Sequence, residues 1–71
     1  MNLQQFEYVL AVSHTGSLTH ASREANITLS AISQSINALE KELGVLVFHR
    51  SKNGCIPTRE GHIIIQYAKE I

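Results

Sequence analysis

The sequence predicts a small, mainly α-helical domain in which a β-hairpin separates three helices from a fourth. Apolar residues recur at helical spacing in four segments, and one short run rich in strand-forming residues interrupts this pattern. Hydrophobic residues make up 44% of the chain and charged residues 17%, which is typical of a folded globular domain. A chain of 71 residues buries only about 60% of the surface that its unfolded form exposes, so one small core is expected.

The first helix is expected to begin near Leu3. Apolar side chains recur at Leu3, Phe6, Val9 and Leu10 with helical spacing. The pattern stops before Gly16, which can adopt the left-handed conformation that ends many helices.

The second helix is expected to be short, with Ser17 as its N-cap and Asn26 as its C-cap. Leu18, Ala21 and Ala25 fall on one side of it. The small alanine side chains permit close packing against a neighbour.

The third helix is the most clearly defined element. It is expected to begin after Thr28, a favourable N-cap, and to end at Gly44. Its apolar stripe consists of Ile32, Ile36, Leu39 and Leu43. Two helices joined by about three or four residues are typical of a helix-turn-helix, which we expect over residues 18–37.

The pattern then becomes that of strands. Val45–Phe48 is rich in strand formers, Ser51–Gly54 is expected to form a turn, and Cys55 and Ile56 return as a second strand. Pro57 is tolerated at the end of an edge strand, and Thr58 is a good N-cap for a fourth helix. A hairpin in this position after a helix-turn-helix is a wing.

Charge is balanced overall but unevenly distributed. Six Lys and Arg residues offset six Glu residues, so the formal net charge is zero, whereas nucleic-acid-binding domains are commonly basic. However, neither 25–39 nor 44–59 contains an acidic residue, and the second range holds Arg50, Lys52 and Arg59. Local charge matters most because salt screens phosphate attraction beyond about 8–10 Å. One positive face is therefore expected, with most of the carboxylates elsewhere: Glu7, Glu24, Glu40, Glu42 and Glu70.

The third helix has a polar side opposite its apolar stripe. Ser30, Gln34, Asn37 and Lys41 fall there on a helical wheel. Amide side chains can pair with adenine, and Ser can donate or accept a hydrogen bond at a base edge. The amino end of the helix, beside Thr28, offers amide donors to phosphate. A plain solvated surface is an equally good explanation of this pattern taken alone.

The wing carries three cations, Arg50, Lys52 and Arg59. These suit contacts with phosphate or with the minor groove. Protection of a hairpin edge against aggregation is the alternative explanation.

Catalysis is not indicated. Ser33, Ser35, His49 and His62 show no catalytic spacing, and the chain has no glycine-rich phosphate loop or zincin motif. We therefore expect a protein that is not an enzyme. A metal-responsive regulator is one alternative, since His49, Cys55 and His62 can approach one another through the wing. Their spacing is not that of a structural zinc site, so no metal ligands are assigned.

A second alternative is a winged helix that binds another protein, because fold does not fix function. Acidic residues on the polar side of the third helix would favour it, and none precedes Glu40. The chain has no long apolar run, no signal peptide and a single cysteine, Cys55. We therefore expect a cytoplasmic protein that does not enter a membrane.

Several short motifs occur in a fixed order over nearly the whole chain. They are Leu3–Phe6, Gly16–Ser22, Ala31–Ile36, Leu39–Gly44, Val47–Arg50 and Pro57–Gly61. In this order the chain resembles the amino-terminal DNA-binding domain of the LysR-type transcriptional regulators of bacteria. The most specific part is Leu-Glu-x-Glu-Leu-Gly followed by Phe-x-Arg and Thr-x-x-Gly.

The resemblance implies that the third helix is a recognition helix that reads double-stranded DNA. Together with the polar pattern, it gives the expected DNA-binding residues: Thr19, His20, Thr28, Leu29, Ser30, Ser33, Gln34, Asn37, Arg50 and Lys52. The family commonly has Gln and Pro where this chain has Leu29 and Ser30, and Arg where it has His20 and Gln34. These departures leave the target sequence and the strength of nonspecific binding open.

The resemblance also implies a homodimer formed through the fourth helix. In the family such dimers can assemble further into tetramers. The expected dimer residues are Ile64, Tyr67, Ala68 and Ile71, an apolar stripe widened by Ile63 and Ile65. The operator is then an interrupted palindrome. In the alternative, this helix folds back onto the first helix and completes the core.

Residues 1–58 are accordingly assigned to the winged helix-turn-helix, with its three-helix core and hairpin wing, and residues 59–71 to the start of a linker and dimerisation helix. No cofactor is expected in this fragment. Family members carry a larger carboxy-terminal domain that binds a small-molecule effector, and the same is expected for a longer parent of this chain.

Overall fold

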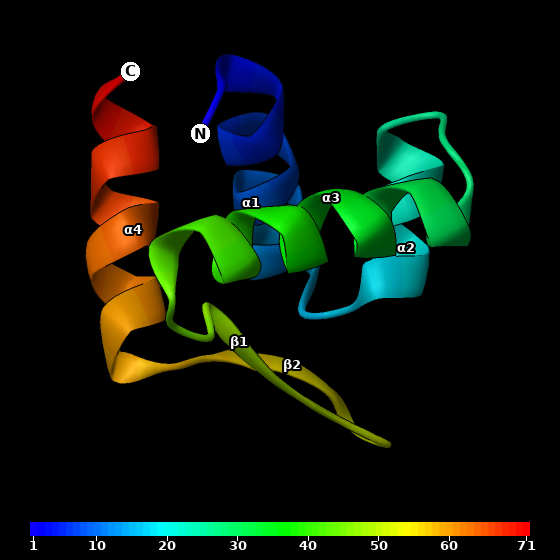
Figure 1. The fold of residues 1–71 in the computed structure, drawn as a ribbon. Coiled ribbons are helices and arrows are strands. Elements are labelled where there is room, and N and C mark those ends of the chain that lie inside the picture. Colours follow the sequence, from blue (N-terminus) through cyan, green and yellow to red (C-terminus); the bar gives the residue numbers. More distant parts are fainter.

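Four α-helices and one antiparallel hairpin make up the computed structural model, which describes residues 1–71 (Figure 1). In chain order the elements are α1 (Leu3–Thr15), α2 (Leu18–Glu24), α3 (Leu29–Leu43), β1 (Phe48–Ser51), β2 (Gly54–Pro57) and α4 (Arg59–Glu70). The predicted winged helix-turn-helix is confirmed, with α2 and α3 as its two helices and the β1–β2 hairpin as its wing.

The helices begin where capping side chains are available. Ser17, Thr28 and Thr58 each accept a hydrogen bond from a backbone amide in the first turn that follows, as the sequence predicts. Asn2 caps α1 in the same way, and the Gln5 side chain returns a hydrogen bond to the Asn2 amide, which completes a capping box.

Left-handed residues end the first three helices. Gly16 ends α1 with φ 71° and Gly44 ends α3 with φ 72°, as predicted. The C-cap of α2 is Ala25, one residue before the predicted position. Asn26 follows with φ 57° and is the only non-glycine residue with positive φ. Asn26 therefore still supplies the left-handed residue that turns the chain toward α3.

The first strand lies three residues later than predicted. It covers Phe48–Ser51 instead of Val45–Phe48. The backbone of Val47 is engaged elsewhere, since its amide donates to the Glu40 side chain and its carbonyl accepts from the Thr58 amide. Pairing with β2 consequently starts only at Phe48, which lies opposite Pro57.

The turn of the wing is also shorter than predicted. Ser51 pairs with Gly54, so only Lys52 and Asn53 form the turn. Gly54 has φ 123°, and a Cβ atom there would lie 2.3 Å from the Gly16 carbonyl oxygen. The Cys55 amide donates to the same oxygen at 2.9 Å. The wing is thus held against the turn between α1 and α2.

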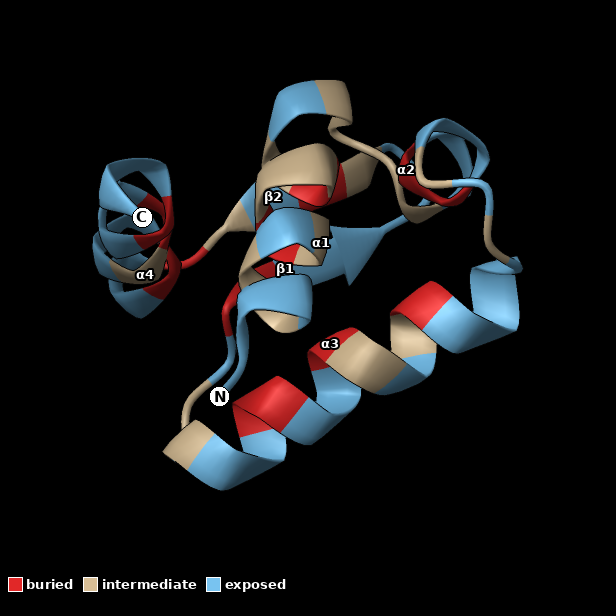
Figure 2. Ribbon diagram, turned by 90° about the horizontal axis from the view of Figure 1, so that it is seen from above, coloured by how far each residue is buried: buried red, intermediate tan, exposed pale blue.

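The core lies between α1, α3 and the base of the wing. Figure 2 shows the buried segments of α3 turned toward α1 and the hairpin, and the exposed segments turned away. The core cluster consists of Val9, Val12, Ala21, Ile32, Ile36, Leu39, Val47, Phe48, Cys55 and Ile65. The predicted stripe of α3 is therefore confirmed, with Leu43 packed at its edge. Leu3, which falls on the apolar side of α1 in the sequence, is 57% exposed.

Helix α4 packs along α1, which agrees with the alternative in which it completes the core. Ile65 and Ala68 are each only 4% exposed. The prediction that Ala68 belongs to an exposed stripe is therefore wrong, because Ala68 lies on the side of α4 that faces the core. Ile64 is half-buried, whereas Tyr67 and Ile71 are exposed. None of the four helices is both long enough and apolar enough to cross a membrane.

Candidate nucleic-acid interface

Helix α3 turns an exposed polar surface to solvent. Ser30, Gln34, Asn37 and Lys41 are all exposed, as predicted, and Ser33 is half-buried beside them. The Gln34 Nε2 atom lies 3.4 Å from Ser30 Oγ, so the amide group lies along the helix surface. Over its first three turns this surface offers hydroxyl and amide groups and no carboxylate, which is the chemistry that base edges recognise.

The amino end of α3 has free backbone donors. Thr28 Oγ1 accepts from the Ala31 amide at 3.0 Å, and the Ile32 amide donates to the Thr28 carbonyl. The amides of Leu29 and Ser30 precede these two and have no acceptor within the helix. Because the helix dipole adds partial positive charge, this end is suited to an anion such as phosphate.

The first turn of α2 is also accessible. Thr19 and His20 are both exposed, as their predicted role requires. Ser17 Oγ accepts from the His20 amide at 3.2 Å, which fixes the start of the helix.

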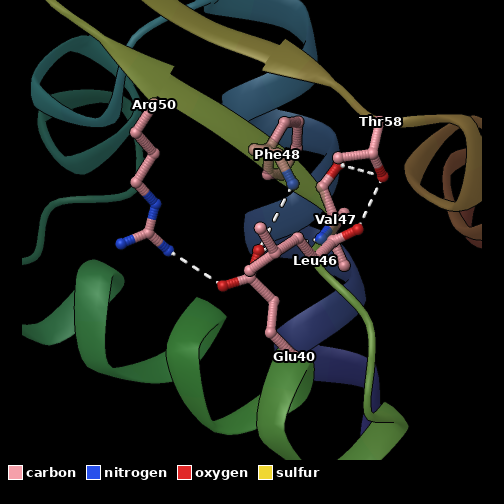
Figure 3. Close-up of polar contacts among 6 residues, drawn as sticks. All are labelled: Glu40, Leu46, Val47, Phe48, Arg50 and Thr58. Atoms are coloured by element: carbon pink, nitrogen blue, oxygen red, sulfur yellow. Dashed lines mark hydrogen bonds and ion pairs between the residues drawn. The ribbon is translucent and has the colours of Figure 1, made fainter.

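Glu40 lies next to the wing and not away from it, so its predicted placement with the distant carboxylates is wrong. Its side chain is buried, and Oε2 accepts from the Val47 amide at 2.8 Å and from the Phe48 amide at 3.3 Å. Its Oε1 atom lies 3.3 Å from Arg50 Nη2 (Figure 3). One carboxylate thus connects α3, the strand entry and the arginine of the wing.

This contact defines where Arg50 sits. The side chain of Arg50 is 32% exposed and points from β1 toward α3, as Figure 3 shows. It therefore lies between the helix and the wing, whereas Lys52 is exposed at the tip of the turn. The sequence contained a signal for the contact, since Glu40 falls one helical turn after the buried Ile36 and so beside the apolar stripe.

The base of the wing has a second polar anchor. The Thr58 hydroxyl donates to the Leu46 carbonyl at 2.5 Å (Figure 3). It also accepts from the Gly61 amide at 2.8 Å. Together with Glu40, this side chain fixes the wing relative to α3 and α4.

No group of three or more His, Cys, Asp or Glu side chains is arranged to hold a metal ion. Cys55 is buried, whereas His49 and His62 are exposed. The three residues that a metal-responsive regulator would use are therefore not brought together.

These elements define the class of winged helix-turn-helix domains. Within that class, residues 3–62 match the family model described as "Bacterial regulatory helix-turn-helix protein, lysR family". The chain belongs to this family, as its motifs predict.

Relatives support the same assignment. The probable HTH-type transcriptional regulator LrrA of Synechococcus elongatus is 38% identical over 71 residues, all of this chain and 24% of that protein. The nitrogen assimilation regulatory protein nac of Klebsiella aerogenes is 35% identical over all 71 residues and 23% of its own length. The chain thus spans about a quarter of the length of the curated relatives it matches.

Solved structures are also similar. The CbnR DNA-binding domain in complex with DNA superposes with a TM-score of 0.95 at 30% identity, over 99% of this chain and 80% of that chain. The BenM DNA-binding domain in complex with catB site 1 DNA gives 0.94 at 34% identity, over 99% and 79%.

Proposed function

We propose that this domain binds double-stranded DNA sequence-specifically, as the DNA-binding domain of a bacterial LysR-type transcriptional regulator. The observation that carries the proposal is the exposed surface of α3, which bears Gln34 and Asn37 and has no carboxylate over its first three turns. The DNA complexes of the similar CbnR and BenM domains support it.

In the proposed complex, α3 enters the major groove. Gln34 and Asn37 hydrogen-bond base edges, and the free amides of Leu29 and Ser30 bind phosphate. Thr19 and His20 approach the backbone from α2. Arg50 and Lys52 bind the flanking backbone or the minor groove. In this arrangement α3 recognises the base sequence, and the wing supplies most of the electrostatic attraction to the DNA backbone.

The proposed assembly is a homodimer through α4. Tyr67 is 62% exposed and Ile71 71% exposed. An entirely apolar hollow of about 230 Å³ lies beside them, lined by Met1, Phe6, Leu43, Ile64, Tyr67 and Ile71. A two-fold dimer that covers these side chains relates its two recognition helices by the same two-fold axis. The operator is therefore an interrupted palindrome.

The rest of the proposal concerns the longer regulator. A carboxy-terminal domain binds a small-molecule effector, dimers associate into a tetramer, and the regulator acts in the cytoplasm. These points follow from membership of the LysR family, which residues 3–62 match, and not from the structure of this domain.

Selection of binding sites from a random duplex library tests the DNA-binding proposal. We expect one enriched motif, whose affinity falls with salt with a slope of about −0.9 in log K per neutralised phosphate. Lys52→Ala at the wing tip should reduce the slope by about one. The matched control is Lys69→Ala, an exposed lysine of α4, which should leave the slope unchanged. Absence of any enriched sequence would contradict the proposal and favour a domain that binds protein.

A further inference from the structure

Leu29 is an exposed apolar side chain at the amino end of α3, between the exposed polar residues Thr28 and Ser30. It is 47% exposed, whereas Ile32, Ile36 and Leu39 of the same helix are fully buried. Leu29 is also absent from the side chains that pack against the core. The fold therefore does not use this leucine for core packing.

The position of Leu29 directs it toward the proposed DNA site. It is the first residue of α3, and in helix-turn-helix proteins the first residues of the recognition helix contact base edges. Leu29 and Glu40 are roughly three helical turns apart, so both project from the side of α3 that faces the wing.

A leucine side chain can recognise only one kind of base edge. It has no hydrogen-bonding group. A base amino or keto group that it contacts therefore loses its hydrogen bonds to water and gains none in exchange. The C5 methyl group of thymine is the apolar feature of the major groove, and apolar side chains contact it.

The neighbour of Leu29 on the helix complements the rest of the thymine edge. Ser33 is one turn further along the same side, within about 5–6 Å between Cβ atoms. No hydrogen bond occupies its hydroxyl, in contrast to the Ser22 hydroxyl, which donates to the Thr19 carbonyl at 2.7 Å. A methyl group and the O4 acceptor lie side by side on thymine.

We propose that Leu29 reads the C5 methyl group of one thymine in each half-site, while the Ser33 hydroxyl donates to O4 of the same base. This inference rests on the proposed function and names the base that the amino end of α3 selects. Such a contact makes the half-site depend on a methyl group and not only on hydrogen bonds.

The test replaces each thymine of the selected half-site in turn by deoxyuridine, which lacks only the methyl group. At one position we expect binding to weaken by about fourfold, the value for one buried methyl group. At that position Leu29→Ala should bind the two duplexes equally, because its shorter side chain does not reach the base. Lys52→Ala is the matched control and should weaken binding to both while preserving their ratio.

A second arm places cytosine or 5-methylcytosine at the same position. The added methyl group should recover part of the affinity in the wild-type domain and none in Leu29→Ala. Two results overturn the inference: no thymine is sensitive to deoxyuridine, or the sensitivity persists in Leu29→Ala. Either result leaves sequence-specific binding itself intact, whereas a domain that selects no sequence overturns the proposed function.

Discussion

Replacing Glu40 with alanine removes the acceptor of two backbone amides at the entry to the wing. These amides belong to Val47 and Phe48, at 2.8 and 3.3 Å from Glu40 Oε2, and both residues are buried. A buried donor left without a partner destabilises a protein by about 1–3 kcal/mol. Because the second bond is long, we expect a total loss of about 2–4 kcal/mol. Domains of this length have a total stability of only about 4–10 kcal/mol, so the loss is large.

The Glu40→Gln variant separates the effect of the two hydrogen bonds on stability from the effect of the negative charge. The glutamine oxygen can accept from the same two amides, so only the charge and the contact with Arg50 are lost. An ion pair whose arginine is 32% exposed contributes at most about 1 kcal/mol. The expected order of stability is wild type, then Glu40→Gln, then Glu40→Ala. Glu42→Ala is the matched control, since Glu42 is exposed on the same helix and pairs only with the exposed terminal amine.

Urea unfolding followed by circular dichroism measures these differences. Glu40→Ala should lower the midpoint without changing the m-value, because the surface exposed on unfolding stays the same. In thermal unfolding each kcal/mol corresponds to about 4–8 °C for a domain of this size. A melting temperature for Glu40→Ala within about 2 °C of that of Glu42→Ala would contradict a role of these hydrogen bonds in stability. A Glu40→Gln variant as unstable as Glu40→Ala would also contradict it, since the loss would then come from the charge and not from the amides.

Three further predictions test the recognition helix, the turn into α4 and the assembly. Gln34→Ala should weaken binding to the preferred duplex by ~1–3 kcal/mol and relax the preference at one base pair, measured by fluorescence anisotropy, with no change in melting temperature. Gly61→Ala should unfold the domain or shift α4, because its Cβ atom would lie 1.9 Å from a loop carbonyl oxygen. By contrast, Gly44→Ala meets no atom within 4 Å; it should lower the free energy of unfolding in urea by only about 1–2 kcal/mol. Tyr67→Asp combined with Ile71→Asp should convert a dimer to a monomer in sedimentation without loss of stability; a wild type that is already monomeric at high micromolar concentration contradicts the dimer.

Local signals made the helix boundaries predictable. Ser17, Thr28 and Thr58 cap helices through hydrogen bonds to amides three residues away, so neighbouring residues alone define those ends. Gly16 and Gly44 end helices for an equally local reason, since glycine tolerates positive φ without strain.

The misplaced features depend on contacts between distant residues. Strand β1 starts late because Val47 is bound by Glu40, which precedes it by seven residues, and by Thr58. No propensity of Val45–Phe48 indicates these partners. The local sequence also does not predict that Glu40 lies beside Arg50, because their distance depends on how the wing folds back over α3.

Helix α4 shows the limit of periodicity. Ile63, Ile64 and Ile65 are consecutive, so apolar side chains surround this part of the helix and several stripes fit equally well. The core selects the side with Ile65 and Ala68. Packing of α4 against α1 and β2 decides this choice, and no periodicity within α4 indicates it.

An NMR titration of the domain with its selected duplex tests directly whether α3 and the wing form the DNA-binding surface. We expect the largest amide shifts over residues 28–37 and 50–54, together with shifts of the Gln34 and Asn37 side-chain amides. Residues on the exposed side of α4, such as Gln66 and Glu70, should shift little beyond any effect of dimerisation that is also seen without DNA. Shifts concentrated on α4 or on the outer side of α1, with α3 unaffected, would contradict this assignment of the surface.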